Sequence, residues 1–193
     1  MWYGSCTAAN RLAMRPDDLE RFTINQGIAQ MKILLAVDGS PCSDVAVEEV
    51  GRRPWPEGSS VKVLNAFELP LPASPEGWAL PPNYFEELDQ AVRTQAQGIV
   101  KRASEKLRTL LDETIRLESE FLAGPPRMVI IDEAERWGAD LIVLGSHGYG
   151  RWERFLLGSV SQSVVSHAKC SVEVVRCPHA KQTEEIDTSK EKK

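Results

Sequence analysis

A glycine-rich segment that follows an apolar run carries the residue types best suited to binding a phosphate. Residues 145–161 read GSHGYGRWERFLLGSVS and come directly after a predicted strand at 140–144. The glycines that open this segment let the main chain approach a ligand without obstruction by side chains. Gly158 and Ser159 then open a predicted helix, whose unpaired first-turn N–H groups and positive dipole end favour an anion. The plainer alternative is that the glycines only turn the chain and the serine only caps the helix.

The same segment offers little for catalysis. The chain has no GxxxxGK[ST], and no GxGxxG follows a predicted strand, which disfavours a P-loop NTPase and a dinucleotide oxidoreductase. Rapid phosphoryl transfer needs a stabilising cation, yet the motif holds no lysine, and Arg151 and Arg154 either reach a γ-phosphate or lie on a solvated face. A triad of His147 with Ser159 and Asp38 has no GxSxG elbow to support it. We therefore predict no catalytic residue and slow or absent hydrolysis.

The four cysteines give no sign of a metal site or a disulfide framework. Cys6, Cys42, Cys170 and Cys177 form no CxxC pair and have no histidine at zinc-finger spacing. Cys170 and Cys177 flank a predicted strand at an odd separation, so we expect their side chains to point to opposite faces. The sequence therefore predicts four reduced thiols, no structural disulfide and no bound metal, as is usual for an intracellular protein.

Composition and charge exclude several classes of partner. The chain has 193 residues, 42% of them hydrophobic, and a formal net charge of −5. Because residues 1–30 and 177–193 each balance their charges, the negative charge belongs to residues 31–176, which argues against nucleic-acid and anionic-membrane binding. The longest apolar run, 33–37, is far shorter than the roughly 20 residues of a membrane-crossing helix. We expect a cytoplasmic protein with no nucleic-acid or membrane partner.

Two tails are expected to flank a single domain. Residues 1–30 lack the apolar segment of a secretory signal and are predicted to be a disordered leader, with organelle targeting as the alternative. Residues 177–193 lack apolar periodicity and are predicted to be a disordered charged tail. The domain itself is assigned to residues 31–176.

The elements that must position the glycine-rich segment alternate between strand and helix. Predicted strands cover residues 32–37, 61–67, 115–122, 140–144 and 172–175. Predicted helices cover 43–53, a long amphipathic stretch from a capping box at Asn83 to Leu110, a stretch from Met128 to a stop at Gly138, and 156–167. The proline-rich connector at 69–82 is expected to be irregular.

This alternation predicts an α/β fold: one doubly wound, Rossmann-like domain with a parallel sheet and helices on both faces. Ligands of such sheets bind beyond the carboxyl ends of the strands, where the strand order reverses. The relevant loops are therefore 38–41, 66–69 and 145–161.

Two separated motifs resemble the ATP-binding type of the universal stress protein family. Gly145-x-x-Gly148, nine further residues and Gly158-Ser159 match the nucleotide motif of that family. The run KILLAVDGS at 32–40 is similar to its first strand and turn, and DLIVLGSHG at 140–148 is similar to its fourth strand and loop. The resemblance covers about residues 31–176. Tyr149 and Trp152 depart from the smaller or basic residues often found in that loop.

The resemblance implies five parallel strands ordered 3-2-1-4-5, with the first and fourth side by side. It also implies that ATP, with Mg²⁺, is the bound cofactor. Asp38 would contact the adenosine part, unless it only stabilises its own turn, and Ala66 would offer main-chain groups to adenine. The positions implied to line ribose and phosphates are Leu144, Gly145, Gly148, Gly158, Ser159, Val160 and Ser161.

The function implied is an ATP-binding stress-response module that acts through nucleotide occupancy and through contacts with a protein partner. The last strand, from Ser171 to Arg176, would pair across a homodimer, since a sheet edge needs covering. One alternative is an ATP-consuming adenylyl-transfer enzyme, although DGSP at 38–41 stands where such enzymes carry an SGGxDS-type loop. The other is a dimeric interaction protein that binds no nucleotide.

Overall fold

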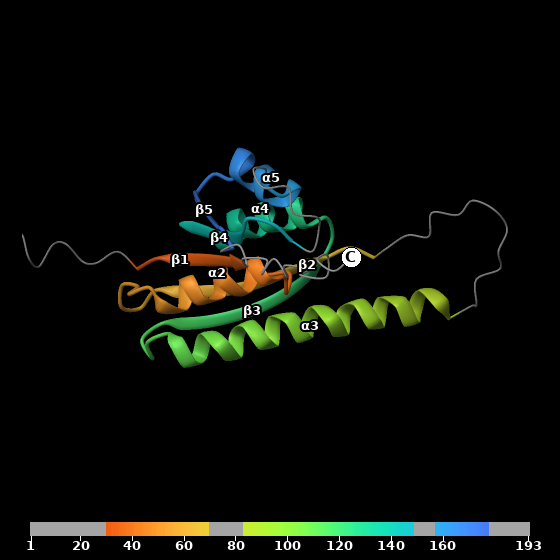
Figure 1. Ribbon diagram of the computed structural model, residues 1–193, viewed down its shortest axis with the longest axis horizontal. Helices are drawn as coiled ribbons and strands as arrows, with labels where there is room; N and C mark the ends of the chain where they lie inside the picture. The colour runs from red at the N-terminus through yellow and green to blue at the C-terminus, as the bar shows by residue number, and fades with distance from the viewer. Residues whose placement is uncertain (1–29, 70–82, 149–156, 178–193) are drawn as a thin grey trace, which may run out of the picture.

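The sheet has five parallel strands in the order β3-β2-β1-β4-β5 (Figure 1). The computed structural model describes residues 30–69, 83–148 and 157–177. Along the chain the elements are β1 (Lys32–Ala36), α2 (Pro41–Arg52), β2 (Ser60–Phe67), α3 (Tyr84–Leu110), β3 (Arg116–Ala123), α4 (Pro126–Trp137), β4 (Leu141–Gly145), α5 (Ser159–His167) and β5 (Ser171–Val175). The predicted fold class and strand order are both confirmed.

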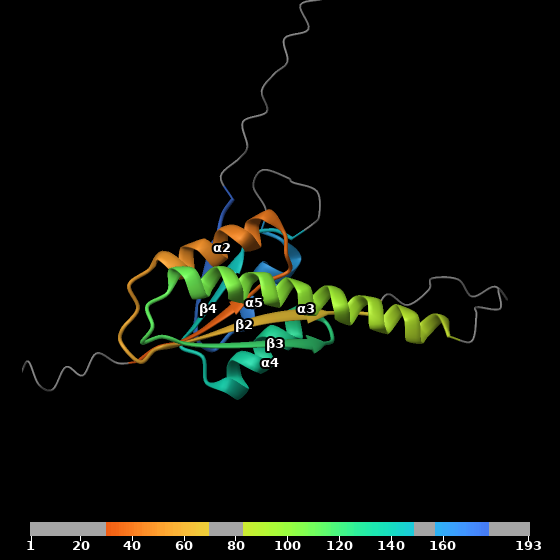
Figure 2. The same cartoon turned by 90° about the horizontal axis from the view of Figure 1, so that it is seen from below.

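The core lies in two layers because alternate residues of the central strands face opposite sides of the sheet. Ile33 and Leu35 of β1 pack toward α2 and α3, whereas Leu34 packs toward α4 and α5, and all three are fully buried. Figure 1 shows α4 and α5 above the sheet and α3 below it, and Figure 2 shows α2 alongside α3. The carboxyl ends of β1 and β4 are adjacent, so the loops that follow them meet.

Helix ends differ from the predictions where capping decides them. α2 begins at Pro41, two residues early, because Ser40 caps it and accepts a hydrogen bond from the Ser43 N–H. α5 begins at Ser159, so residues 157 and 158, which were predicted to be helical, lie before the helix. Gly138 ends α4 in the left-handed conformation, as predicted. The capping box at Asn83 is wrong, because the Asn83 side-chain amide bonds the Glu87 carboxylate instead of the main chain.

The prediction of four reduced thiols is also wrong. Cys42 and Cys177 form a disulfide across 135 residues of sequence, with their Cα atoms 4.9 Å apart, and Cys170 is a free thiol. From the sequence we considered only whether Cys170 and Cys177, at the two ends of one strand, could pair. The partner of Cys177 is instead Cys42, which lies in a helix. α2 packs against β4 and β5, which brings its first turn close to Cys177, two residues past the end of β5.

Several predictions concern residues outside the described ranges. All but one residue of each of the predicted leader (1–30), connector (69–82) and tail (177–193) lies outside, as do residues 149–156 of the glycine-rich segment. Arg151 and Arg154, and likewise Tyr149 and Trp152, fall there. Within the described ranges, no helix combines the length and the apolar character needed to cross a membrane.

Candidate functional site

A cavity of about 340 Å³ opens at the carboxyl ends of β1 and β4, where the strand order reverses. Its wall comes from the ends of β1, β2 and β4, the first turn of α2, and the starts of α4 and α5. All nine predicted site residues lie in this wall: Asp38, Ala66, Leu144, Gly145, Gly148, Gly158, Ser159, Val160 and Ser161. The fold thus brings together residues that are up to 123 positions apart in sequence. Their roles in binding stay predictions.

Asp38 both stabilises its own turn and faces the cavity. Its Oδ1 accepts a hydrogen bond of 2.9 Å from the Ser40 N–H, which forms an Asx turn, and Gly39 takes a positive φ of 82° between them. The other oxygen, Oδ2, faces the loop after β4, because a Cβ built on Gly148 would lie 2.6 Å from it. A side chain at position 148 would have to displace the carboxylate from this place.

The loop after β4 is held by bonds from three sides. The main-chain carbonyl of Ser146 accepts a hydrogen bond of 2.9 Å from the Gly158 N–H, and the Ser146 N–H donates to the Val175 carbonyl at 2.7 Å. The Ser40 hydroxyl donates to the His147 carbonyl at 3.3 Å. These bonds fix the main chain at Ser146, His147 and Gly158 before any ligand arrives.

The Ser161 side chain is engaged in hydrogen bonds within the protein. Its hydroxyl is buried and donates to the Gly145 carbonyl at 2.8 Å, with the Ser146 carbonyl a second acceptor at 3.3 Å. Because the proton is used within the protein, the hydroxyl positions the loop. Main-chain N–H groups in the first turn of α5, where Ser159 and Val160 line the cavity, are donors for an anion at this end.

The opposite end of the cavity is apolar and is formed partly by residues that the sequence did not single out. Leu64 of β2 and Pro126 and Ile130 of α4 line it. A usable signal for Pro126 was the Gly124-Pro125-Pro126 stretch after the third predicted strand, which is also a strand-end loop. Apolar walls with a few polar groups are typical of sites for flat organic ligands.

Main-chain groups of Ala66 complete this end. The Leu64 carbonyl accepts a hydrogen bond from the Val37 N–H, so the main-chain groups of Leu64 point toward β1. Those of Ala66, two residues further, point the same way by the alternation of a strand. Since β1 ends at Ala36, they face the cavity rather than another strand.

Cationic side chains are absent from the part of the cavity wall that the structure describes. His147 lies in the wall, and its Nδ1 is 3.1 Å from the Ser146 hydroxyl. In the described ranges no group of three or more His, Cys, Asp and Glu side chains could hold a metal ion. The arrangement is suited to binding an anion through main-chain dipoles beside a single carboxylate.

Residues 31–176 match the model of the universal stress protein family. The chain is 39% identical over 95 residues to universal stress protein MJ0531 of Methanocaldococcus jannaschii, an alignment that covers 49% of this chain and 54% of the relative. It is 28% identical over 148 residues to YxiE of Bacillus subtilis, which covers 75% of this chain and 98% of the relative. The chain therefore spans about half the length of some of its curated relatives and nearly all of others.

Solved structures show the same fold. UspA from Lactobacillus plantarum aligns with a TM-score of 0.62 and 29% identity over 77% of this chain and 99% of that one. A family protein from Arabidopsis thaliana, solved with AMP bound, aligns with a TM-score of 0.57 and 20% identity over 80% and 97% of the two chains. A universal stress protein in complex with cAMP aligns with a TM-score of 0.54 and 20% identity over 78% and 99%.

Proposed function

The chain belongs to the universal stress protein family, and we propose that it binds ATP in the cavity between the ends of β1 and β4. The observation that carries the proposal is the pairing of two unlike ends in one cavity. One end offers the first turn of α5 and a loop of bare glycines, and the other offers an apolar wall beside the main chain of Ala66. An adenine nucleotide has the matching pair of ends, a flat base and a polyanion.

The phosphate end would bind by main-chain dipoles, without a lysine. N–H groups at a helix start attract phosphate through their partial positive charge. The start of α5 is already tied to the loop after β4, because the Gly158 N–H donates to the Ser146 carbonyl. The AMP and cAMP in the two solved family members agree with an adenine nucleotide as the class of ligand. ATP itself is our assignment, made on the glycine spacing.

Mg²⁺ would enter with the nucleotide. One carboxylate together with phosphate oxygens and waters is the usual environment of Mg²⁺ in nucleotide sites. Asp38 is the acidic side chain of the described wall, and the Ser159 hydroxyl is a second oxygen there. These residues fit an ion that the phosphates bring with them.

The protein would act as a binding module, and a protein partner would distinguish the ATP-bound form from the empty one. The described wall contains no cation to stabilise a phosphoryl-transfer transition state, so hydrolysis should be slow or absent. Because a bound ligand stabilises only the state that binds it, ATP would change the stability of the loops around the cavity.

A second copy of the chain is the proposed neighbour of β5. β5 is an edge strand, and a homodimer through Ser171 to Arg176 would pair its free side. An unknown protein partner would then recognise the occupied dimer.

The test is to separate binding from turnover. Protein is denatured as purified, released nucleotide is identified by mass spectrometry, and the apo protein is titrated calorimetrically with Mg-ATP, Mg-GTP and AMP. Retained or titratable ATP with no ADP or AMP produced over hours supports the proposal. Rapid AMP release would instead identify an adenylyl-transfer enzyme, and a silent titration at millimolar ATP would leave an interaction protein.

A further inference from the structure

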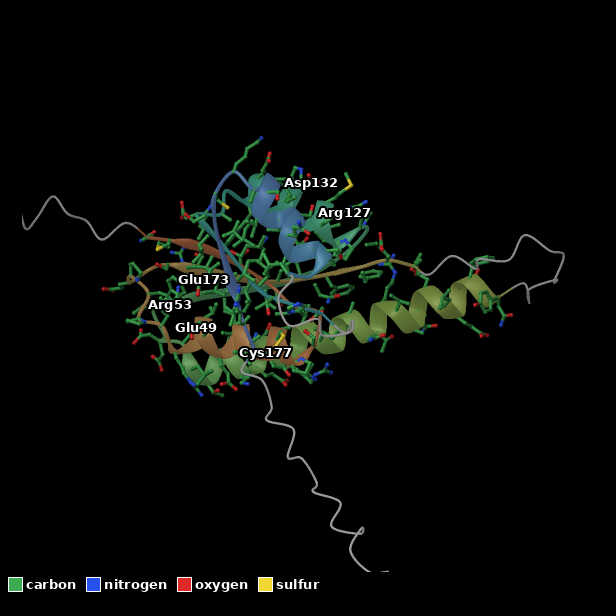
Figure 3. All side chains as sticks on the ribbon, turned by 45° about the horizontal axis from the view of Figure 1, so that its top comes forward. Glu49, Arg53, Arg127, Asp132, Glu173 and Cys177 are labelled. Carbon is green, nitrogen blue, oxygen red and sulfur yellow. A yellow bond between two sulfur atoms is a disulfide. The ribbon has the colours of Figure 1, made fainter. Side chains whose placement is uncertain are left out.

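The disulfide joins the nucleotide cavity to the end of the sheet. Cys42 lies in the first turn of α2 and is 1% exposed, whereas Cys177 follows β5 and is partly exposed. Figure 3 labels Cys177 beside α2, where the chain leaves β5. The two sulfurs therefore differ in their access to solvent.

Cys42 contacts the phosphate end of the cavity directly. A Cβ built on Gly145 would lie 2.9 Å from the carbonyl carbon of Cys42 and 3.0 Å from its Cβ. The Cys42 sulfur is 4.0 Å from the Ser146 hydroxyl, and the next residue, Ser43, lines the cavity. With no space between them, a movement of Cys42 must be passed to Gly145 and Ser146.

Cys177 reaches the same loop through the strand that precedes it. The Val175 carbonyl, two residues before Cys177, accepts the hydrogen bond from the Ser146 N–H. The bridge therefore fastens two structures, the first turn of α2 and the end of β5, that both hold Ser146. Breaking it leaves each of them with fewer restraints.

We propose that Cys42 and Cys177 form a reversible thiol–disulfide switch that sets the affinity of the cavity for nucleotide. The disulfide form holds Gly145 and Ser146 in the geometry that binds phosphate, and the dithiol form loosens them. The inference rests on the proposed function, because it names how that same site is regulated. It adds a modification, reversible oxidation of two thiols, to the nucleotide cavity.

The chemistry is ordinary disulfide exchange with a dithiol reductant. A thiolate of the reductant attacks Cys177, the more exposed sulfur, and the bond to Cys42 breaks as Cys42 leaves as a thiolate and takes up a proton. The second thiol of the reductant then releases Cys177 as a thiol. The reductant becomes a cyclic disulfide, so two electrons and two protons pass to the protein.

Linkage requires the effect to run both ways. If the disulfide form binds ATP more tightly, bound ATP must make the disulfide harder to reduce by the same factor. A merely structural disulfide that is not coupled to the site would show neither effect. This reciprocity gives a readout that does not depend on measuring affinity.

The experiment compares the oxidised full chain with the same chain reduced by dithiothreitol, using calorimetric titration with Mg-ATP. We expect the dissociation constant to rise about fivefold or more on reduction, at the low end of coupling between linked sites. Cys177→Ser should bind Mg-ATP with the dissociation constant of the reduced wild type, and dithiothreitol should not change that value. Cys170→Ser is the matched control, since it removes the free thiol of the described residues and should keep the response.

In parallel, the fraction of protein reduced at a fixed ratio of reduced to oxidised dithiothreitol is measured by alkylation and mass spectrometry, with and without ATP. A lower reduced fraction with ATP supports the switch. If the oxidised and the reduced chain both bind ATP with the same dissociation constant, the switch is overturned and the proposed function stands. No binding in either form overturns both. Should Cys177→Ser not fold, the comparison of the two wild-type forms decides alone.

Discussion

At the scale of single residues, the shape of the cavity depends on glycines that have no side chain to fill it. Gly148 has no positive φ, so the cost of a side chain there comes from the contact with the Asp38 carboxylate. Asp38 in turn cannot move freely, because its Oδ1 holds the Ser40 N–H. Gly145 is more tightly enclosed, with main-chain atoms of Cys42 and Ser43 within 3.0 Å of a built Cβ. The two positions thus differ in what a methyl group would displace.

Replacing Gly148 with alanine should therefore weaken ATP binding without unfolding the protein. The added Cβ would push the Asp38 carboxylate away from its place in the cavity wall, and we expect the dissociation constant to rise about tenfold, which is about 1.4 kcal/mol. Calorimetric titration measures the effect.

Gly98→Ala is the matched control for that substitution. Gly98 lies inside α3, where a built Cβ meets only the end of the Arg102 side chain at 3.5 Å. The change should leave ATP binding as it is and raise the stability by about 0.5–1 kcal/mol, because alanine is the better helix former. Unchanged affinity in Gly148→Ala would show that the ligand lies elsewhere.

At the scale of elements, ion pairs fix the helices that carry the cavity wall. Lys62 of β2 is buried, and its ammonium is 2.9 Å from Glu133 Oε1 of α4, the helix that supplies Ile130 to the wall. Burial raises the pKa of Glu133, but the bonds from Arg136 and Lys62 outweigh it, so that the net pKa is lowered. The Glu133 carboxylate therefore stays charged opposite Lys62, as a buried cation requires.

α2 is fastened to β5 at both of its ends. The disulfide holds the start of the helix. At the other end, the C-cap residue Arg53 donates two hydrogen bonds of 2.7 Å to the Glu173 carboxylate and one to Glu49. These three residues are labelled together in Figure 3. The bond from Arg53 lowers the pKa of Glu173 more than burial raises it.

A carboxylate with a lowered pKa stabilises the fold at neutral pH and loses that contribution in acid. The contribution of Glu173 is present above its unfolded value near 4.5 and disappears as the pH falls from there through the lower value of the folded state. We expect Glu173→Gln to cost about 0.5–1 kcal/mol at pH 7, the range of partly exposed ion pairs, and nothing at the acid end. Urea unfolding from pH 7 to pH 3 measures this.

The control for the acid series is Glu57→Gln, which removes a carboxylate from the exposed loop after α2. Its unfolding free energy should follow that of the wild type across the series. A stability difference for Glu173→Gln that stays constant down to pH 3 would contradict the assigned role of the Arg53 pair.

At the scale of the whole molecule, the proposed homodimer depends on β5, which lies at the edge of the sheet among the residues that the structure describes. The Ser171 N–H donates to the Asp140 carbonyl and the Val175 carbonyl accepts from the Ser146 N–H, so residues 171, 173 and 175 bond toward β4. The main-chain groups of Val172 and Val174 consequently point away from the sheet. They are the groups that a second copy would pair with.

Val174→Pro tests the proposed dimer because it removes an outward N–H and none of the bonds to β4. We expect the wild type to show twice the 21.5 kDa chain mass by light scattering and the variant to show the chain mass, with its fold kept by circular dichroism. A wild type that is monomeric at all concentrations, or a variant that remains dimeric, would exclude this edge as the interface.

Local pattern in the sequence was enough for the architecture and the glycine loop. Alternating apolar runs and helical periodicity determine the elements, and the right-handed crossover of parallel strands leaves few arrangements for them. The particular strand order came from the family resemblance of the two motifs. The spacing from Gly145 to Ser159 pointed to the loop that the structure places beside Asp38. These features could be predicted because each depends on residues close together in the chain or on rules that hold for every such sheet.

Only the tertiary structure decided which distant side chains meet. The bond between Cys42 and Cys177, the partnership of Lys62 with Glu133 and the place of Ile130 in the cavity wall join residues from different elements. No spacing in the sequence encodes such pairs, because they depend on how the helices lie across the sheet. The use of the Ser161 hydroxyl to hold Gly145 was hidden for the same reason: its acceptor is set by the packing of α5 against β4 and not by its neighbours in the chain.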